Sequence, residues 1–201
     1  MKLIADLQYF SPAIFFSYLS NSTHCIFDQY EHFQKMSFMN RCTLLGGNGP
    51  INLTVPLDGG RNQRSVMKEV KILNRENWQD RHWKTITSCY NKSPWFDHYR
   101  DELENLYSLK FEFLIDWNLR CFQWIYDKLA IKTPISLSGE FVKDYDMNIY
   151  EDLRGKLMPS TINKNFPDAV RYPQVFGDRF GFVTNLSVLD YLFCVGPRST
   201  F

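Results

Sequence analysis

The first 27 residues constrain the fold most, because they alternate strand-like and helix-like segments. The segments Lys2 to Leu7 and His24 to Phe27 are short and apolar, which predicts two strands. Between them, Ser11-Pro12 predicts a helix start, with serine as the N-cap and proline in the first turn, and Ala13 to Leu19 continues that helix. This β-loop-α-β order predicts an α/β fold, in which the first loop is a common place for ligands to bind.

A β-hairpin and a further strand are predicted next. Asn40 to Leu45 and Ile51 to Leu57 have the composition of strands and flank Gly46-Gly47-Asn48-Gly49, a strong turn signal. Val66 to Leu73 is predicted as another strand. Together these segments predict a mixed sheet that opens with the β-loop-α-β unit and carries a hairpin.

The pattern becomes helical from Arg75 to Ala130. Apolar and aromatic residues recur there at three-to-four spacing, which predicts a packed helical segment, with a break near Ser93-Pro94 because proline disfavours helical geometry in the residue before it. Pro134 to Ser138 is then predicted as a short strand, and Gly139 to Tyr172 as irregular structure. Since no internal repeat or clear linker appears, residues 1–201 are expected to form a single domain.

The composition excludes several classes of partner. Lys and Arg total 23 while Asp and Glu total 22, so no overall charge attracts nucleic acid or an anionic membrane. The apolar stretches are shorter than the roughly 20 residues of a spanning helix, and no signal-peptide pattern is present. We therefore expect a cytoplasmic protein without a transmembrane segment and without a nucleic-acid partner.

Metal and cofactor signals are missing as well. The five cysteines are scattered and include no C-x-x-C pair, which argues against a disulfide framework and against a structural zinc site. The histidines lack metal-ligand spacing, and no Walker or dinucleotide fingerprint occurs. Neither a metal nor a cofactor is predicted.

Polar and charged side chains are concentrated between Asp28 and Pro56, after the second predicted strand. Asp28 directly follows that strand, a position typical of catalytic carboxylates, although a carboxylate there also caps turns. Asn40 and Arg41 suit a phosphate, a carboxylate or a sugar hydroxyl. The alternative for Arg41 is a structural ion pair with Asp28 or Glu31.

Four more residues have both a functional and a structural interpretation. His82 lies on a predicted helix and suits a general base, because imidazole titrates near physiological pH. Its alternative is a core histidine bonded to a backbone carbonyl. Gln8 and Tyr9 in the first loop either contact a sugar or a base, or they pack in the interior. Lys35 is either an electrostatic clamp or a solvated surface lysine.

Motifs along nearly the whole chain match one family pattern. In the first half they are Phe33, Lys35, Ser37, Asn40-Arg41, Asn48-Gly49-Pro50, Leu53-Thr54-Val55-Pro56, Trp78, His82, Ile86, Tyr90, Pro94 and Phe96. In the tail they are Tyr172-Pro173-Gln174-Val175-Phe176, Gly181-Phe182, Asn185-Leu186-Ser187, Leu189-Asp190, Leu192-Phe193 and Gly196-Pro197. With these motifs in this order, the chain resembles the WbqC-like protein family, which is found in gene clusters for O-antigen and other surface polysaccharides.

The resemblance implies a transferase that places an acyl or aminoacyl group on a nucleotide-linked amino sugar. In that interpretation the catalytic candidates are His82, Asp28 and Lys35, and the substrate-binding candidates are Gln8, Tyr9, Asn40, Arg41 and Tyr90. The partner is then a small molecule, either a nucleotide-sugar or an acyl donor.

One departure from the family pattern lies in the first loop. Many members have a His-Gln-Pro run ahead of the tyrosine and proline of this loop, whereas this chain has Asp6-Leu7-Gln8-Tyr9-Phe10-Ser11-Pro12. A histidine suited to acid, base or phosphate-ligand chemistry is therefore missing. If that histidine is catalytic in relatives, this chain uses another group or has lost the activity.

Two alternative functions stay open. A non-catalytic binding or scaffold protein of the same pathway would show a large exposed apolar patch and a self-complementary surface, which also fits a homo-oligomer. A nucleotidyl-transfer enzyme would use the β-loop-α opening to bind its nucleotide, against which stand the missing glycine fingerprint and the missing histidine.

Overall fold

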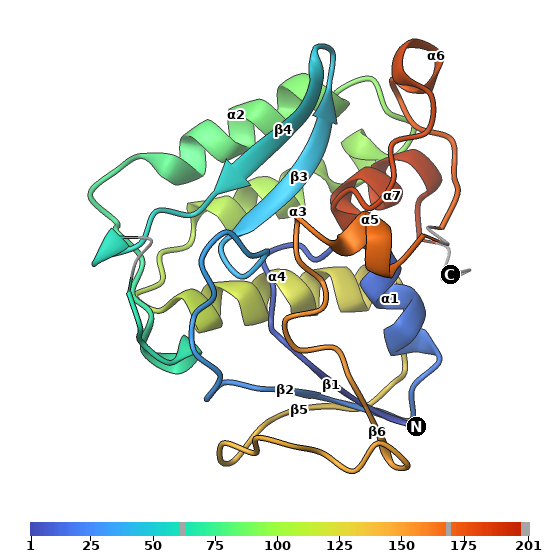
Figure 1. The fold of residues 1–201 in the computed structure, drawn as a ribbon. Coiled ribbons are helices and arrows are strands. Elements are labelled where there is room, and N and C mark those ends of the chain that lie inside the picture. The colour runs from blue at the N-terminus through green and yellow to red at the C-terminus, as the bar shows by residue number, and fades with distance from the viewer. Residues whose placement is uncertain (61–62, 168–169, 198–201) are drawn as a thin grey trace.

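Two separate sheets organise the fold (Figure 1). The computed structural model describes residues 1–60, 63–167 and 170–197. The larger sheet has the strand order β5-β2-β1-β6, and each neighbouring pair is parallel. Its strands are β1 (Lys2–Ala5), β2 (His24–Phe27), β5 (Ile135–Leu137) and β6 (Tyr150–Asp152).

The predicted hairpin forms the second sheet. Strands β3 (Arg41–Gly46) and β4 (Gly49–Thr54) pair antiparallel, and the pairing of Gly46 with Gly49 leaves Gly47-Asn48 as the turn. Gly49 has a φ of 114°, which glycine adopts without steric cost. The α/β class, the β-loop-α-β opening and the hairpin are thus confirmed. The parallel and antiparallel strands lie in two sheets, not in one.

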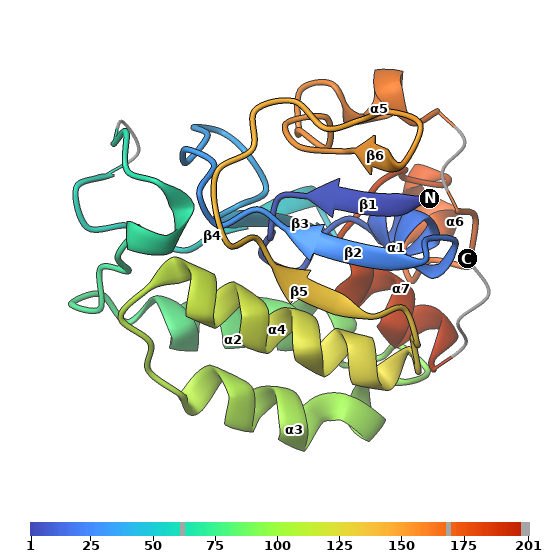
Figure 2. The ribbon, with the colours of Figure 1, turned by 90° about the horizontal axis from the view of Figure 1, so that it is seen from below.

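Helices cover one face of the parallel sheet. Phe27 of β2 packs against Phe15 of α1 (Ala13–Ser20) and Phe122 of α4 (Leu114–Lys128), with ring centroids 6.0 and 4.8 Å away. Figure 2 shows α4 beside β5 at this side of the sheet. This face therefore contains the apolar core between the sheet and the helices.

The other helices pack around the hairpin and α4. Helices α2 (Trp78–Tyr90) and α3 (Phe96–Ser108) lie against each other, and α2 also contacts β3. The predicted helical segment and its break before Phe96 are confirmed. After β6 come α5 (Ile162–Asn165), α6 (Gly177–Phe180) and α7 (Val188–Val195). No helix in these described ranges has the length and apolar character needed to cross a bilayer.

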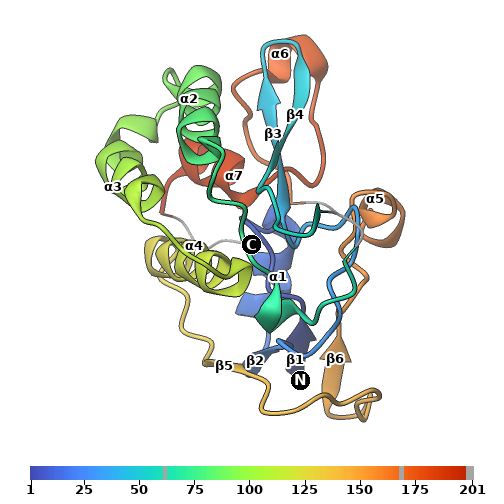
Figure 3. The same cartoon turned by 90° about the vertical axis from the view of Figure 1, so that its left-hand side faces the viewer.

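An irregular segment, residues 139–149, joins β5 to β6, and we call it the strap. In Figures 1 and 3 the strap runs beneath the sheet, on the side away from α4. Parallel sheets usually carry helices on both faces. Here, among the described residues, the face away from α4 carries no helix, and in Figure 2 the strap passes the carboxyl ends of the strands.

The strand predicted from Val66 to Leu73 is not formed. This stretch contains the 3₁₀-helix η2 (Met67–Glu69), and only isolated bridges link its ends to other segments. The 3₁₀ turn places Met67 and Val70, three residues apart, on the same buried side. The apolar residues that suggested a strand therefore serve a turn.

Candidate functional site

The carboxyl ends of all the parallel strands carry polar side chains. Asp6 follows β1, Asp28 follows β2, Ser138 follows β5, and β6 ends in Asp152. Because parallel strands point the same way, these side chains gather at one edge, where open α/β sheets bind ligands.

One arginine joins three carboxylates at this edge. Arg154 Nη1 lies 2.8 Å from Asp28 Oδ2 and 3.4 Å from Glu31 Oε2, and its Nη2 lies 2.7 Å from Asp152 Oδ2. We call these four residues the Arg154 knot. The Asp28 side chain is fully buried and that of Arg154 is 8% exposed. Hydrogen bonds to Asp152 and Asp28 raise the pKa of Arg154, so its charge is retained.

Asp28 has a full set of partners in the knot. Besides Arg154, its Oδ1 accepts hydrogen bonds from Ser138 Oγ at 3.0 Å and from the Tyr30 N–H at 2.9 Å. Asp28 therefore caps the turn after β2, which was one of its two interpretations, and it also anchors the arginine.

The knot holds the strap against the strand ends. Arg154 donates hydrogen bonds to the carbonyl oxygens of Val142 and Lys143 at 2.8 and 2.9 Å, and its guanidinium lies 5.0 Å from the Tyr145 ring centroid. A surface cavity of about 350 Å³ borders this contact, and it is lined by Ile26, Ser136, Leu137, Ser138, Gly139, Glu140, Val142 and Tyr145.

A larger cavity lies on the other side of β5. It measures about 490 Å³, its lining is mainly apolar, and it includes Phe27, Phe111, Leu119, Ile135 and Leu137. None of the predicted site residues lines it, and neither does any member of the knot. A binding or catalytic site needs a few precisely placed polar groups. We therefore place the candidate site at the strand ends and not in this apolar groove.

Asp6 is the most perturbed carboxyl group at the edge. Its Oδ2 accepts a hydrogen bond from the Gly155 N–H at 2.8 Å, whereas its Oδ1 has no partner among the described residues. Burial, and to a lesser extent the charges of Glu31 and Asp152, raise the pKa of Asp6 to about 7, while the Gly155 bond and Arg154 oppose the rise.

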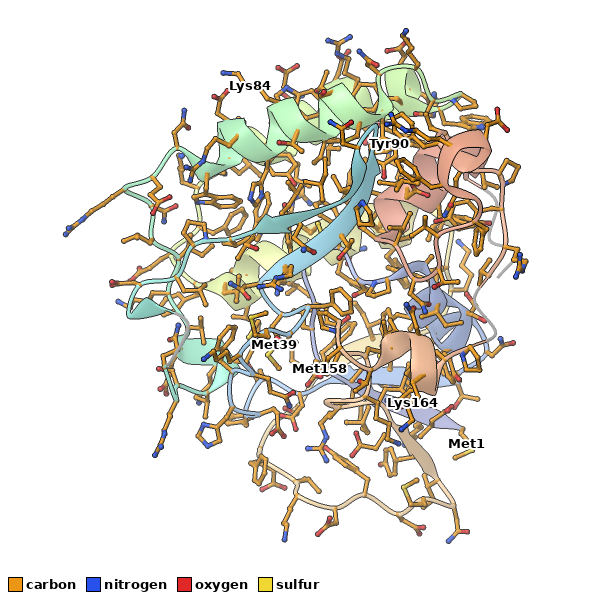
Figure 4. All side chains as sticks on the ribbon, turned by 45° about the horizontal axis from the view of Figure 1, so that its top comes forward. Met1, Met39, Lys84, Tyr90, Met158 and Lys164 are labelled. Atoms are coloured by element: carbon orange, nitrogen blue, oxygen red, sulfur yellow. The ribbon has the colours of Figure 1, made fainter. Side chains whose placement is uncertain are left out.

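Gln8 faces the segment that contains Gly155 and Leu157, residues 155–157, which we call the covering segment. Its Nε2 donates to the Leu157 carbonyl oxygen at 3.1 Å, and the loop after β2 approaches this segment where Gln34 lies against Gly155. Figure 4 labels Met39 and Met158, which mark these two segments. Three stretches that are distant in sequence therefore meet over the strand ends.

His82 is buried beside the first loop. Its Nδ1 lies 3.0 Å from the Tyr9 hydroxyl, which also hydrogen-bonds to the Tyr107 hydroxyl. Burial lowers the pKa of His82 to about 4, against the opposing effect of a backbone hydrogen bond at Thr54. The ring is therefore neutral at pH 7, and Tyr9 provides the bond that orients it.

The base of the hairpin holds two more predicted residues. Asn40 donates to the Val55 carbonyl oxygen at 2.9 Å, and Arg41 pairs with Thr54 across the hairpin. The Arg41 side chain contacts Met36, with its Nη2 3.5 Å from the Met36 Sδ, and its buried Nε has no partner within the described part of the chain. Lys35 is exposed nearby.

Tyr90 lies apart from this region. It is buried where α2 meets α7, as Figure 4 shows, and its hydroxyl donates to Asp190 Oδ1 at 2.7 Å. It also accepts a hydrogen bond from the Leu45 N–H at 3.2 Å. Burial raises the pKa of Asp190, and the bond from Tyr90 opposes that rise.

The structure thus forms two neighbouring groups from the predicted residues. Gln8 and Asp28 lie at the strand ends, while Asn40, Arg41 and His82 surround the base of the hairpin. The first loop links the two groups, because Tyr9, which bonds His82, directly follows Gln8. Lys35 is at the surface and Tyr90 is not part of either group.

Sequence reasoning missed Asp6, Asp152 and Arg154. Asp6 was placed inside a strand predicted to reach Leu7, whereas β1 ends at Ala5. Asp152 and Arg154 fall in the stretch predicted to be irregular. The rule that selected Asp28, a carboxylate directly after an apolar strand, would have found Asp6 had the strand end been placed correctly.

The candidate site consists of side chains that form hydrogen bonds and ion pairs. Throughout the described ranges, no three His, Cys, Asp or Glu residues are grouped so that they could hold a metal ion. The carboxylates of the knot are instead bonded to a guanidinium.

Comparison with known proteins gives one match. The model of the WbqC-like protein family matches residues 8–157, most of the chain. The match includes the hairpin, the helical segment and the Arg154 knot, and it ends before the tail motifs. No curated protein and no solved structure matches the chain.

Proposed function

The chain belongs to the WbqC-like protein family, and from that premise we propose that it transfers an acyl or aminoacyl group to the amine of a nucleotide-linked amino sugar in the cytosol. The amine nitrogen attacks the carbonyl carbon of the donor, the new C–N bond forms, and the leaving group departs with its bonding electrons. The association of the family with surface-polysaccharide gene clusters supports this class of acceptor.

One observation carries the proposal: a half-buried arginine without an acidic partner. Arg41 lies at the base of the hairpin, makes no ion pair with any described residue, and keeps a buried Nε without an acceptor. A buried N–H that lacks an acceptor costs about 1–3 kcal/mol. A phosphate or carboxylate of a substrate would supply the missing acceptor, and Lys35 is the second cation in that loop.

The other predicted residues take roles around this anion site. His82, neutral at pH 7, accepts the proton of the attacking amine through the Tyr9 hydroxyl, which takes up that proton as it passes its own to the His82 Nδ1. Asn40 and Gln8 orient the sugar. Asp28 acts through Arg154 and keeps the strand ends in position, and Tyr90 contributes through the packing of α2.

Nucleotide-sugars are expected to stabilise the protein. A ligand that binds only the folded state at 100-fold above its Kd adds about 2.7 kcal/mol, which raises the Tm of a chain of this size by about 5–10 °C. We expect this shift for a nucleotide-linked amino sugar in a thermal melt. Arg41→Ala should reduce the shift by more than half, because the anion loses its main donor.

Arg100→Ala is the matched control, since Arg100 is an exposed arginine on α3 and should keep the full shift. The proposal is wrong if a panel of nucleotide-sugars and acyl donors leaves the Tm unchanged and Arg41→Ala leaves the cellular polysaccharide unaltered.

A second candidate function, a non-catalytic scaffold of the same pathway, is favoured by the strap. Phe141, Met147 and Ile149 are 51%, 62% and 49% exposed, which is unusual for large apolar side chains. Such side chains suit a protein partner or a second copy of the chain. The melts separate the two candidates, because a scaffold gains no stability from nucleotide-sugars.

A further inference from the structure

Two buried oxygen atoms on the first loop lack hydrogen-bond donors. Asp6 and Gln8 are 4% and 3% exposed, and neither Asp6 Oδ1 nor Gln8 Oε1 has a partner among residues 1–60, 63–167 and 170–197. Most buried polar atoms in proteins are paired, so two unpaired acceptors on one loop need an explanation.

Both side chains are fixed by the same covering segment. The Gly155 N–H binds Asp6 Oδ2, and the Leu157 carbonyl oxygen binds Gln8 Nε2. The Gln8 amide cannot turn over, because its oxygen would then face another carbonyl oxygen. The two free acceptors are therefore held in place, and a ligand with several N–H donors would satisfy them.

The nearby arginine cannot supply these donors. Arg154 uses Nε on Asp152, Nη1 on Asp28, Glu31 and a strap carbonyl oxygen, and Nη2 on Asp152 and a second strap carbonyl oxygen. A guanidinium has five N–H donors, so little capacity remains for Asp6. The cluster thus combines four carboxyl groups with one guanidinium and favours an added positive charge.

The cluster is also reachable from the surface. The side chains of Glu31 and Asp152 are 24% and 21% exposed, and both lie close enough to Asp6 to influence its ionisation. On the strap side, the cavity of about 350 Å³ borders the residues that Arg154 contacts. Glu31 and Asp152 are therefore the members of the cluster that a ligand meets first from the surface.

We propose that Asp6, together with Gln8, Glu31 and Asp152, binds the primary amino group of the acceptor in its ammonium form, which passes one proton to the Asp6 carboxylate before the free amine attacks the donor. The identity of this acceptor as an amino sugar rests on the proposed function. An ammonium group brings three N–H donors and a positive charge, which match the two free acceptors and the surplus of carboxylates. A hydroxyl brings one donor and no charge, and an acetamide is larger and neutral.

This site also has a defined pH dependence. The charged groups that face Asp6 are Glu31 and Asp152, which favour its protonated form, and Arg154, which favours its ionised form. Ammonium binding requires the carboxylate, and the pKa of Asp6 is about 7. For an amine that stays protonated, affinity should therefore rise between pH 6 and pH 8.

The test compares three ligands that differ only at C2 of the sugar: UDP-glucosamine, UDP-glucose and UDP-N-acetylglucosamine. Titration calorimetry should show the amine ligand binding about 10- to 100-fold more tightly than the other two, as expected for hydrogen bonds to a charged group. Asp6→Asn should reduce this preference to about threefold or less. Asp144→Asn, an exposed change on the strap, should leave it intact.

If Asp6→Asn folds poorly, Glu31→Gln serves as the second variant, because Glu31 is partly exposed. It should weaken the preference for the amine ligand severalfold. Equal affinity for the three ligands, or a preference that survives Asp6→Asn, would overturn the amine site and leave the proposed function standing. Failure of all three to bind would overturn the amine site, and it would overturn the proposed function as well if the wider ligand panel leaves the Tm unchanged and Arg41→Ala leaves the cellular polysaccharide unaltered.

Discussion

Arg154→Met is expected to lower the free energy of unfolding by about 3–5 kcal/mol. The fully buried Asp28 carboxylate would lose the guanidinium 2.8 Å away and keep only its Ser138 and Tyr30 bonds. A buried charge without its counter-charge is among the most costly changes in a folded protein. Chemical denaturation at pH 7 measures the loss, which is a large fraction of the 5–15 kcal/mol of a typical domain.

Two comparison variants make this result specific. Arg81→Met removes an exposed ion pair with Glu76 and should cost about 1 kcal/mol or less. Adding Asp28→Asn to Arg154→Met should restore part of the stability, because the unpaired charge is then gone. An Arg154→Met variant as stable as Arg81→Met would show that the knot does not hold the strand ends.

Asp6→Asn is expected to change how stability depends on pH. The pKa of Asp6 is about 7 in the folded protein and near 3.8 in the unfolded chain, so the folded state keeps a proton that the unfolded state releases. The stability that Asp6 contributes is therefore fully present below pH 4 and is lost as pH rises to 7. This difference between the folded and unfolded pKa of Asp6 corresponds to about 3–5 kcal/mol in the free energy of unfolding.

Asparagine stays neutral at every pH. The free energy of unfolding of Asp6→Asn should therefore rise by that amount, relative to the native protein, between pH 4 and pH 8. Urea denaturation of both proteins at each pH measures the gain. Subtracting the stability curve of the native protein from that of the variant cancels the contribution of His82, which is the same in both. The lowered pKa of His82 makes the fold less stable toward pH 4. Parallel curves for the two proteins would mean that Asp6 titrates normally.

The apolar elements of this fold were predictable because their signals are local. The strand from His24 to Phe27 and the helix that begins at Ala13 were expected from short apolar runs next to a proline and a serine, and they are formed. The hairpin was expected from its glycine-rich turn, and its strands are present. The local sequence therefore located these elements, but the predicted N-cap was wrong: the N-cap of α1 is Pro12, not Ser11, and no side chain caps the helix start.

The site was less predictable because it depends on pairing between distant segments. Strand β6 consists of Tyr150, Glu151 and Asp152, which carry no apolar pattern, and it forms because it pairs with β1 at the edge of the sheet. Without that strand, Arg154 has no evident place near Asp28. The proximity of His82 to Tyr9 was likewise a matter of tertiary packing.

The central claim is that the strand ends form a binding site for an amine, with Asp6 at its centre. Carbon NMR of the Asp6 carboxyl group, titrated with and without saturating UDP-glucosamine, tests it most directly. The claim predicts a midpoint near pH 7 in the free protein and a fall of about one pH unit or more with the ligand, because an ammonium group stabilises the carboxylate. A midpoint near 4, or one that the ligand does not move, would contradict it.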